Sequence, residues 1–269
     1  MIEQADAIEW LYKQPPQSVD LIISSPPYQD SRLYLENGED IGIARQAGAW
    51  VNWMFDVYVA SLRACKGLVA YVMEGRTKDF AYLATPIRLA AKLFESGITL
   101  RKPPIFHRVG IPGSGGPDWL RNDYEFVICA TNGGKLPWSD NTACGHKPKY
   151  PAGGAMSHRN ADGVRKDGKG YIPPKNSNPG NVIHRNVGGG VMGSKLCHEN
   201  EAPFPEALAE FFIKSFCPPG GLVADPFAGS GTTLAVAERL GRRAIGCDIR
   251  KSQVELTARR LAEAQPGDN

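Results

Sequence analysis

The sequence predicts a doubly wound α/β fold with a mostly parallel central sheet. Near the start, a helical pattern at 7–12 is followed by the apolar run 19–23, which closes a β-α-β unit and so requires parallel strands. Near the end, a short strand at 222–224 leads into the glycine-rich turn 225–233 and a helix, and another strand and helix follow. We therefore expect the two halves to share one parallel sheet.

The composition is that of an ordinary globular protein. The 269 residues are 42% hydrophobic and 22% charged, which suits one large domain or a core with an inserted lobe. The net charge of +3 favours no class of partner. The six cysteines include no C-x-x-C pair, so neither a disulfide framework nor a standard zinc knuckle is indicated, and we expect a cytoplasmic protein. No signal peptide and no apolar run of about 18 residues occurs, so we expect no membrane span.

Hydrophobic periodicity and turn residues place the other elements in order. Asp6 with Glu9, and Ser252 with Glu255, have the spacing of capping boxes at the first and last helices. The stretch 29–46 has no sustained period and predicts a loop. Helices are expected over 7–12, 49–65, 80–94 with Pro86 near its first turn, the segment between Pro205 and Pro218, 232–240 and the residues from 252 onward. Strands are expected at the N-terminus and over 19–23, 68–73, 98–109, 124–131, 222–224 and 244–247, with 98–109 and 124–131 as an antiparallel pair at one sheet edge.

The loop that follows strand 19–23 is the first candidate site. It consists of Ser25, Pro26, Pro27 and Tyr28, and the two prolines make the turn rigid. The Ser25 hydroxyl and the Pro26 carbonyl can accept the two hydrogens of an exocyclic amine while the Tyr28 ring stacks on the face of the base. The alternative is that the prolines only end the strand and that Tyr28 packs on the core.

The glycine-rich turn 225–233 is the second candidate site. Gly229 and Gly231 lead into a helix, so backbone N–H groups and the positive helix end can bind an anion. Leu234 stands where a dinucleotide site has its third glycine, and no P-loop lysine follows, so a carboxylate suits the turn better than a pyrophosphate. Asp248 ends the next strand, where a carboxylate usually accepts from ribose hydroxyls. S-adenosylmethionine, a nucleoside with an amino-acid tail, fits both features; the alternative is a turn used only for close helix packing.

The stretch 135–197 differs in composition from both of its flanks. It is rich in Gly, Pro, Asn and basic residues, contains interleaved aromatic residues and is otherwise poor in apolar ones. This pattern indicates a loop-built lobe that binds a polyanion, and a disordered, solvated insertion is the alternative. Cys144 and His146, together with Cys197 and His198, could also bind zinc, although their spacing matches no usual zinc finger.

Taken together, these residues resemble the amino-methyltransferases of DNA, in the circularly permuted group whose amine-binding motif precedes the cofactor motif. The resemblance rests on 25–28 followed by 225–233 and covers nearly the whole chain outside the basic stretch. It implies a seven-stranded, mostly parallel, Rossmann-like methyltransferase sheet. It also implies that 135–197 is an inserted, loop-rich target-recognition lobe between the core segments 1–134 and 198–269.

The resemblance further implies roles for single residues. The glycines of the turn would contact the methionine part of S-adenosylmethionine, Asp248 its ribose and Asp6 its adenine amino group. The segment 198–206 resembles the family's cofactor-covering motif, and 121–125 resembles the strand that borders the target-recognition insertion. The expected cofactor-binding residues are Asp6, Ala7, His198, Phe204, Asp225, Pro226, Phe227, Gly229, Ser230, Gly231, Thr232 and Asp248. The expected catalytic residues are Ser25, Pro26, Pro27 and Tyr28, and no metal is expected.

The residue at position 25 bears on the base that is modified. Within that family, serine is typical of cytosine-N4 enzymes, and aspartate or asparagine of adenine-N6 enzymes. Ser24 stands where the cytosine group usually has threonine, and both residues carry a hydroxyl. C5-methylation would need a nucleophilic cysteine after a proline, whereas Cys217 precedes Pro218. The resemblance therefore implies methyl transfer to N4 of a cytosine flipped out of a specific duplex sequence.

Three alternatives stay open at this point. An adenine-N6 enzyme of the same group is the closest. The basic stretch argues against a methyltransferase that acts on RNA or on a protein glutamine, and the intact Ser25, Tyr28, Gly229 and Asp248 argue against a catalytically silent DNA-binding protein. Double-stranded DNA is the expected partner, and a homodimer and a companion restriction endonuclease are both compatible with the sequence.

Overall fold

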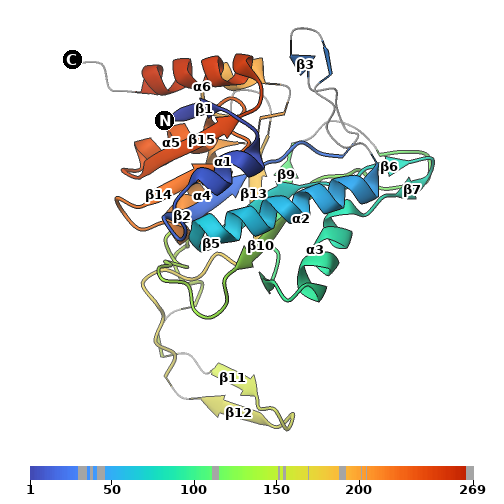
Figure 1. Ribbon diagram of the computed structural model, residues 1–269. Coiled ribbons are helices and arrows are strands. Elements are labelled where there is room, and N and C mark those ends of the chain that lie inside the picture. Colours follow the sequence, from blue (N-terminus) through green and yellow to red (C-terminus); the bar gives the residue numbers. More distant parts are fainter. Residues whose placement is uncertain are drawn as a thin grey trace.

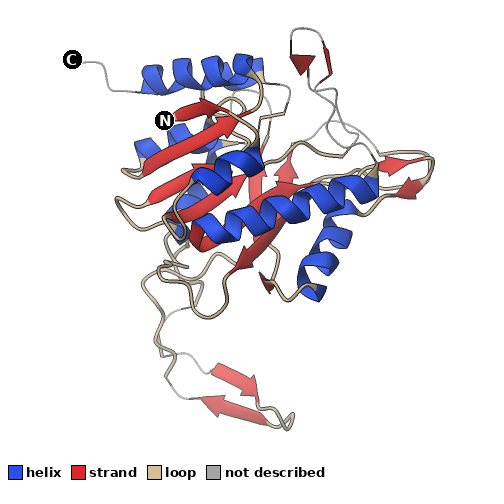
Figure 2. Ribbon diagram, viewed as in Figure 1, coloured by secondary structure: helices blue, strands red, loops and turns tan. Residues whose placement is uncertain are grey.

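A nine-stranded sheet with helices on both faces forms the centre of the computed structural model (Figures 1 and 2). The structure describes residues 1–29, 35–36, 39–40, 46–110, 115–150, 152–153, 156–168, 170–187, 192–200, 202–203 and 205–264. In sheet order the strands are β1 (Ile2–Gln4), β15 (Arg243–Asp248), β14 (Leu222–Asp225), β2 (Val19–Ser24), β5 (Cys65–Met73), β10 (Tyr124–Thr131), β9 (Ile105–Val109) and β13 (Val182–Asn186), while β8 (Thr99–Arg101) also pairs with β10.

Most of the strand pairs in this central sheet are parallel. The run from β1 to β5 is parallel throughout and β13 joins β9 in parallel, while among the described strands of this sheet β10 alone pairs antiparallel, with β5, β8 and β9. The predicted mostly parallel, doubly wound sheet is confirmed, but it has nine strands rather than seven. The predicted strand 98–109 is divided into β8 and β9 at Pro103 and Pro104, which have no N–H for the ladder. The ninth strand, β13, comes from the basic stretch and forms the edge of the sheet beyond the antiparallel pair.

The first three helices of the chain cover one face of the sheet, and the fourth and fifth cover the other. The helices are α1 (Ala7–Lys13), α2 (Ala47–Ala64), α3 (Thr85–Glu95), α4 (Glu206–Phe216), α5 (Thr232–Arg239) and α6 (Lys251–Ala264), with a 3-10 helix η1 (Lys195–Glu199) next to α6. Side chains of α1 to α3 form one buried cluster and those of α4 and α5 form another. Ile22 of β2 belongs to the first cluster, whereas Leu21 and Ile23 belong to the second, because successive strand side chains point to opposite faces. The sheet is therefore buried between two apolar layers.

The helix predicted over 80–94 begins later than expected. Asp79, Phe80 and Ala84 have positive φ values of 49°, 62° and 52°, which an α-helix does not accept. The residues before α3 instead form a small hairpin of β6 (Thr77–Lys78) and β7 (Ala81–Tyr82). Pro86 lies in the first turn of α3, as predicted.

The first turn of α6 also differs from the prediction. The helix begins at Lys251, so Ser252 lies inside it and the expected capping box is wrong. The Arg250 N–H at the helix start is instead bound by Asp248 Oδ1 at 3.0 Å. The carboxylate at the end of β15 thus accepts from the N–H of the residue directly before the helix.

Part of the basic stretch projects away from the sheet. The hairpin of β11 (Met156–Arg159) and β12 (Arg165–Gly168) extends beyond the body of the molecule (Figure 1). Most of the predicted loop 29–46 lies outside the described residues, apart from the paired strands β3 (Leu35–Glu36) and β4 (Glu39–Asp40). Within the described ranges, no helix has both the length and the apolar character needed to cross a membrane.

Candidate active site

The carboxyl ends of the parallel strands bring both candidate sites to one edge of the sheet. β2 ends at Ser24, β14 at Asp225 and β15 at Asp248, and these strands are parallel neighbours. β10 runs the other way, so its first residues, including Glu125, reach the same edge. In open α/β sheets, ligands bind in the crevice outside these strand ends.

A direct hydrogen bond joins the two motifs. Ser24 Oγ donates to Asp225 Oδ1, and both side chains are buried. The same carboxylate oxygen accepts from the Phe227 backbone N–H at 3.0 Å, which holds the start of the glycine-rich turn. Burial raises the pKa of Asp225 to about 6, against the lowering effect of these hydrogen bonds. Asp225 therefore fixes the turn from inside the protein.

The loop after β2 is held by bonds to two other elements. Trp50 Nε1 of α2 donates to the Pro27 carbonyl at 2.8 Å. Ser25 Oγ donates to Tyr28 Oη at 3.3 Å, and Tyr28 Oη donates to Glu125 Oε2 at 2.8 Å. Burial, followed by the charge of Glu125, raises the pKa of Tyr28 well above its usual value, so the phenol keeps its proton. Ser25 and Tyr28 remain partly exposed, whereas Pro26 is buried.

Glu125 lies within a cluster of charged side chains. Its Oε1 forms an ion pair with Arg108 Nη1 of β9 at 3.0 Å, and the residue is only 7% exposed. Glu74 follows Met73, whose partner across the antiparallel pair is Phe126, so the continued register sets Glu74 opposite Glu125. Burial raises the pKa of Glu74 to about 7, and the neighbouring Glu125 adds to the rise.

Gly229 and Gly231 meet two requirements of the glycine-rich turn. Their φ values are 51° and 74°, in the left-handed region that side chains disfavour. A Cβ on Gly229 would also lie 2.3 Å from Asn200 Nδ2, and one on Gly231 would lie 2.8 Å from the Thr257 methyl carbon. Thr257 Oγ1 in turn donates to the Gly229 carbonyl at 2.7 Å. The turn thus requires glycine at both positions, because the backbone is left-handed and the neighbouring side chains leave no room for a Cβ atom.

Asp248 is tied to the same turn. Its Oδ2 accepts from the Gly229 N–H at 3.0 Å, and its Oδ1 accepts from the Arg250 N–H. The residue is 9% exposed. The carboxylate therefore sets the position of the turn, in addition to the ribose contact that remains a prediction.

The other predicted cofactor residues have different surroundings. Asp6 Oδ1 accepts from the Ile8 and Glu9 N–H groups and caps α1, as predicted, and Ala7 is buried. The Phe227 ring meets Trp53 and Tyr71 edge-on, with centroids 5.5 and 6.1 Å away. The Pro226 carbonyl accepts from Cys247 Sγ at 3.3 Å, and Ser230 and Thr232 are buried. His198 is exposed on η1, and Phe204 lies outside the described residues.

The zinc alternative finds no support in the described part of the chain, where no three His, Cys, Asp or Glu side chains gather as a metal site requires. Cys144 instead lies with its Sγ 3.9 Å from the Phe211 carbonyl, and Cys197 is buried.

Comparison with protein families decides the identity. Residues 19–259, most of the chain, match the family described as DNA methylase, which comprises the N6 and N4 enzymes. The chain belongs to the N6/N4 DNA methylase family. It is a DNA methyltransferase, and the family leaves open whether adenine N6 or cytosine N4 is modified.

Named relatives of the methylase include a type II methyltransferase and an adenine methyltransferase. It is 26% identical over 280 residues to the type II methyltransferase M.ScaI of Streptomyces caespitosus, covering 98% of this chain and 82% of the relative. It is 28% identical over 264 residues to the DNA adenine methyltransferase YhdJ of Escherichia coli strain K12, covering 97% and 82%.

Solved structures agree with the fold of the methylase. The cytosine-N4-specific PvuII DNA methyltransferase superposes with a TM-score of 0.69 at 20% identity, covering 97% of this chain and 85% of the other. TTHA0409 of Thermus thermophilus, in complex with S-adenosyl-L-methionine, superposes with a TM-score of 0.62 at 22% identity, covering 99% and 95%. These likenesses confirm the doubly wound methyltransferase fold.

Several residues of the methylase site were not singled out by the sequence. Gln253, Thr257 and Arg260 occupy one face of α6 and are buried; Thr257 and Arg260 bind the glycine-rich turn, and Gln253 accepts from Asn200. Arg260 Nη1 donates to the Ser230 carbonyl at 3.1 Å, and its Nη2 pairs with Glu206 Oε1 at 2.6 Å. A polar stripe at helical spacing was the available signal, since a helix facing only the core would be apolar there.

Proposed function

We propose that this methylase transfers a methyl group from S-adenosylmethionine to the exocyclic N4 of a cytosine that is flipped out of a specific duplex sequence. The observation that carries the base assignment is Ser25, whose hydroxyl hydrogen is directed to Tyr28 at 3.3 Å. Its lone pairs are then left for the hydrogens of a target amine. The circularly permuted motif order, with 25–28 before 225–233, supports an amino-methyltransferase of DNA and is the same for either base.

The glycine-rich turn fits the amino-acid part of this cofactor. The turn opens α5, where helix N–H groups favour a carboxylate, and Gly229 permits close approach. Asp248 at the end of β15 would accept from the ribose hydroxyls, and Asp6, between β1 and α1, would meet the adenine amino group. The solved relative TTHA0409 is named as a complex with S-adenosyl-L-methionine. When bound, the cofactor supplies an electrophilic sulfonium methyl.

The catalytic residues of the chain would act by positioning. Ser25 and the Pro26 carbonyl accept the two amine hydrogens, so the nitrogen lone pair points away from them and toward the methyl donor. The Tyr28 ring stacks on the base and is held by packing against the core, while its hydroxyl donates to Glu125. No covalent bond between enzyme and base is needed, because the exocyclic nitrogen is itself the nucleophile.

The runner-up is adenine-N6 methylation. It is favoured by the name of the relative YhdJ, a DNA adenine methyltransferase, whereas the PvuII enzyme is named as cytosine-N4-specific. Ser25 separates the two, because an ionised carboxylate or an amide carbonyl is a stronger acceptor for the adenine amine than a hydroxyl. We therefore retain cytosine as the base.

The basic stretch 135–197 is proposed as the target-recognition lobe. The hairpin of β11 and β12 carries Arg159 and Arg165 on directly paired positions, both exposed. Two cations on a projecting hairpin suit the phosphate backbone of a duplex. A lobe of this kind also favours DNA over a protein glutamine as the substrate.

Labelled methyl transfer tests the proposal. The protein is incubated with methyl-labelled S-adenosylmethionine and, in separate reactions, with duplex DNA of mixed sequence, structured RNA and a glutamine-containing protein. We expect label in the DNA alone, at a defined sequence. Label only in RNA or protein, or no transfer to any DNA by a folded protein, would overturn the proposal.

A further inference from the structure

We propose that Tyr28 and Glu125 form a proton relay with Ser25, which takes the surplus proton from the methylated amine. This inference rests on the proposed function and deepens it, because direct transfer leaves the product nitrogen with a positive charge and one proton too many. Serine is a poor base, so the proton needs a further acceptor. The three side chains supply a connected path to one.

The hydrogen bonds of this relay have one direction. Ser25 Oγ donates to Tyr28 Oη at 3.3 Å, and Tyr28 Oη donates to Glu125 Oε2 at 2.8 Å. Each hydroxyl has a single hydrogen, so Ser25 keeps only lone pairs for the target amine. The carboxylate at the end of the relay can only accept while it is ionised. The direction of proton transfer, from the amine to the carboxylate, therefore follows from which groups can donate a hydrogen.

The surroundings keep Glu125 ready to accept. Arg108 Nη1 of β9 lies 3.0 Å from its Oε1, on the oxygen that the relay does not use. Glu74, beyond the end of β5, is the neighbouring acid; burial, with the charge of Glu125 adding to it, raises the pKa of Glu74 to about 7. Tyr28 approaches from the loop after β2. With Glu125 only 7% exposed, the cation and the second acid both act at close range.

The step balances without another reactant. The N–H bond of the cationic methylated amine breaks and its electron pair returns to nitrogen, while the proton bonds to Ser25 Oγ. The original Ser25 hydrogen moves to Tyr28 Oη, and the original Tyr28 hydrogen moves to Glu125 Oε2. The products are a neutral methylamino base and a neutral carboxylic acid, and Ser25 and Tyr28 end as intact hydroxyls.

The decisive variant is Tyr28→Phe, because it keeps the stacking face and removes only the relay hydroxyl. If stacking were the whole role of Tyr28, this variant would keep much of its activity. The relay instead predicts that the single-turnover rate of DNA methylation falls about tenfold or more, toward the range typical of lost proton-transfer groups. Affinities for S-adenosylmethionine and DNA should stay as in the wild type.

Tyr58→Phe is the matched control. Tyr58 is buried, and its hydroxyl donates to the Ile128 carbonyl at 2.7 Å, away from the catalytic loop. The control also loses a tyrosine hydroxyl bond, so it reports any general effect on the fold. We expect its methylation rate to stay near that of the wild type.

A double variant and a pH profile distinguish a relay from a structural bond. Glu125→Gln should slow the reaction as much as Tyr28→Phe, and the double variant should be no slower than the slower single one, since residues acting as a unit are not additive. The wild-type rate should fall at acid pH as Glu125 becomes protonated, and this fall should vanish in Tyr28→Phe. A Tyr28→Phe rate equal to that of Tyr58→Phe, with an unchanged acid limb, overturns the relay while the proposed function stands. A wild-type protein that methylates no DNA overturns both.

Discussion

Ser24, at the end of β2, donates a hydrogen bond to the carboxylate of Asp225, at the end of β14, across 201 positions of sequence. The bond lies in the buried interior and connects the loop that would hold the target amine to the turn that would hold the cofactor. In the proposed mechanism, the distance between the reacting groups would therefore depend on two adjacent strand ends.

Removing this bond should cost stability. Ser24→Ala leaves the buried Asp225 with one donor fewer, and we expect the free energy of unfolding to fall by about 1 to 3 kcal/mol. Denaturation in urea measures the loss. Ser18→Ala is the control, because the Ser18 hydroxyl also donates, to the Pro15 carbonyl at 2.7 Å, but in an exposed position. Equal losses in the two variants would contradict a special role for the buried bond.

Asp248 should contribute to cofactor affinity. Asp248→Asn keeps the size of the side chain and removes the charge that would accept from ribose hydroxyls, so S-adenosylmethionine should bind about ten- to hundredfold more weakly. Calorimetry on the folded variant measures this. Asp20→Asn is the matched control, since Asp20 also binds a backbone N–H, that of Leu222 at 2.9 Å, but from the start of β2. Unchanged affinity in Asp248→Asn would refute the ribose assignment.

The raised pKa of Glu74 should make the stability of the protein depend on pH. Its pKa in the folded protein is about 7 against an ordinary 4.5, so the stability it contributes is complete below pH 4.5 and is lost as the pH rises through about 7. Glu74→Gln stays neutral throughout. From pH 5 to pH 8, its free energy of unfolding should therefore rise relative to the wild type by about 2 kcal/mol, allowing for partial exposure. Glu95→Gln, at an exposed position, serves as control. If the free energies of unfolding of Glu74→Gln and the wild type differ by the same amount at every pH, the raised pKa of Glu74 is contradicted.

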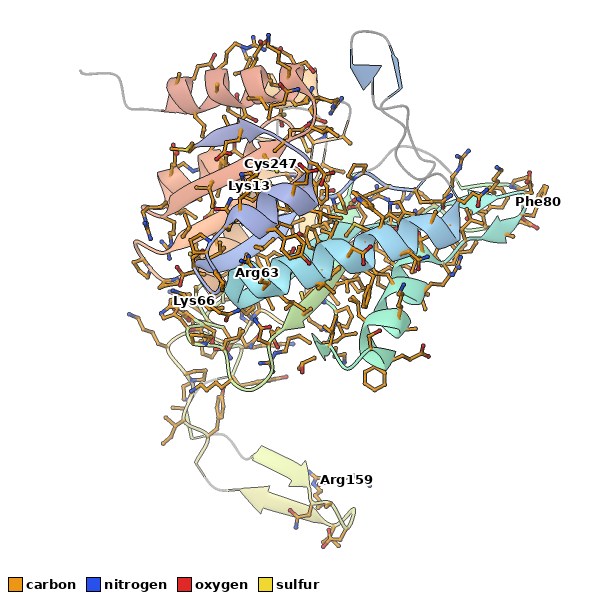
Figure 3. The ribbon with its side chains drawn as sticks, in the orientation of Figure 1. Lys13, Arg63, Lys66, Phe80, Arg159 and Cys247 are labelled. Carbon is orange, nitrogen blue, oxygen red and sulfur yellow. The ribbon has the colours of Figure 1, made fainter. Side chains whose placement is uncertain are left out.

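The projecting hairpin should determine the salt dependence of DNA binding. Arg159, labelled at the hairpin in Figure 3, pairs in register with Arg165. If each contacts a phosphate, replacing both with glutamine should lower the log–log slope of affinity against salt by about 1.8. Lys13→Gln on α1 is the control and should leave the slope unchanged. If the double arginine variant and Lys13→Gln have the same slope, the DNA phosphates contact residues outside this hairpin.

The sequence predicted the fold well where local patterns decide it. The apolar run of β2, the prolines at positions 26 and 27 and the turn around Gly231 each specify their own structure, and the structure contains all three. The helix start near Phe80 was wrong because an apolar period continues through residues whose backbone is left-handed. Tertiary context, rather than local pattern, sets such a boundary.

The supporting residues of the site could not be predicted in the same way. Glu125 meets Tyr28 only because β10 runs antiparallel and brings its first residues to the edge where the parallel strands end. Likewise, Arg260 reaches the glycine-rich turn only through the way α6 packs. Contacts between residues far apart in sequence follow from topology, and no spacing in the chain encodes them.

The identity of the methylated base tests the central claim most directly. Duplex DNA is methylated by the wild-type protein, digested to nucleosides and separated by mass, with a Ser25→Ala reaction alongside. Because Ser25 would hold the target amine and not the cofactor, Ser25→Ala should give little product while binding S-adenosylmethionine as tightly as the wild type. We predict N4-methylcytosine and no N6-methyladenine from the wild-type protein; N6-methyladenine without N4-methylcytosine would contradict the assignment.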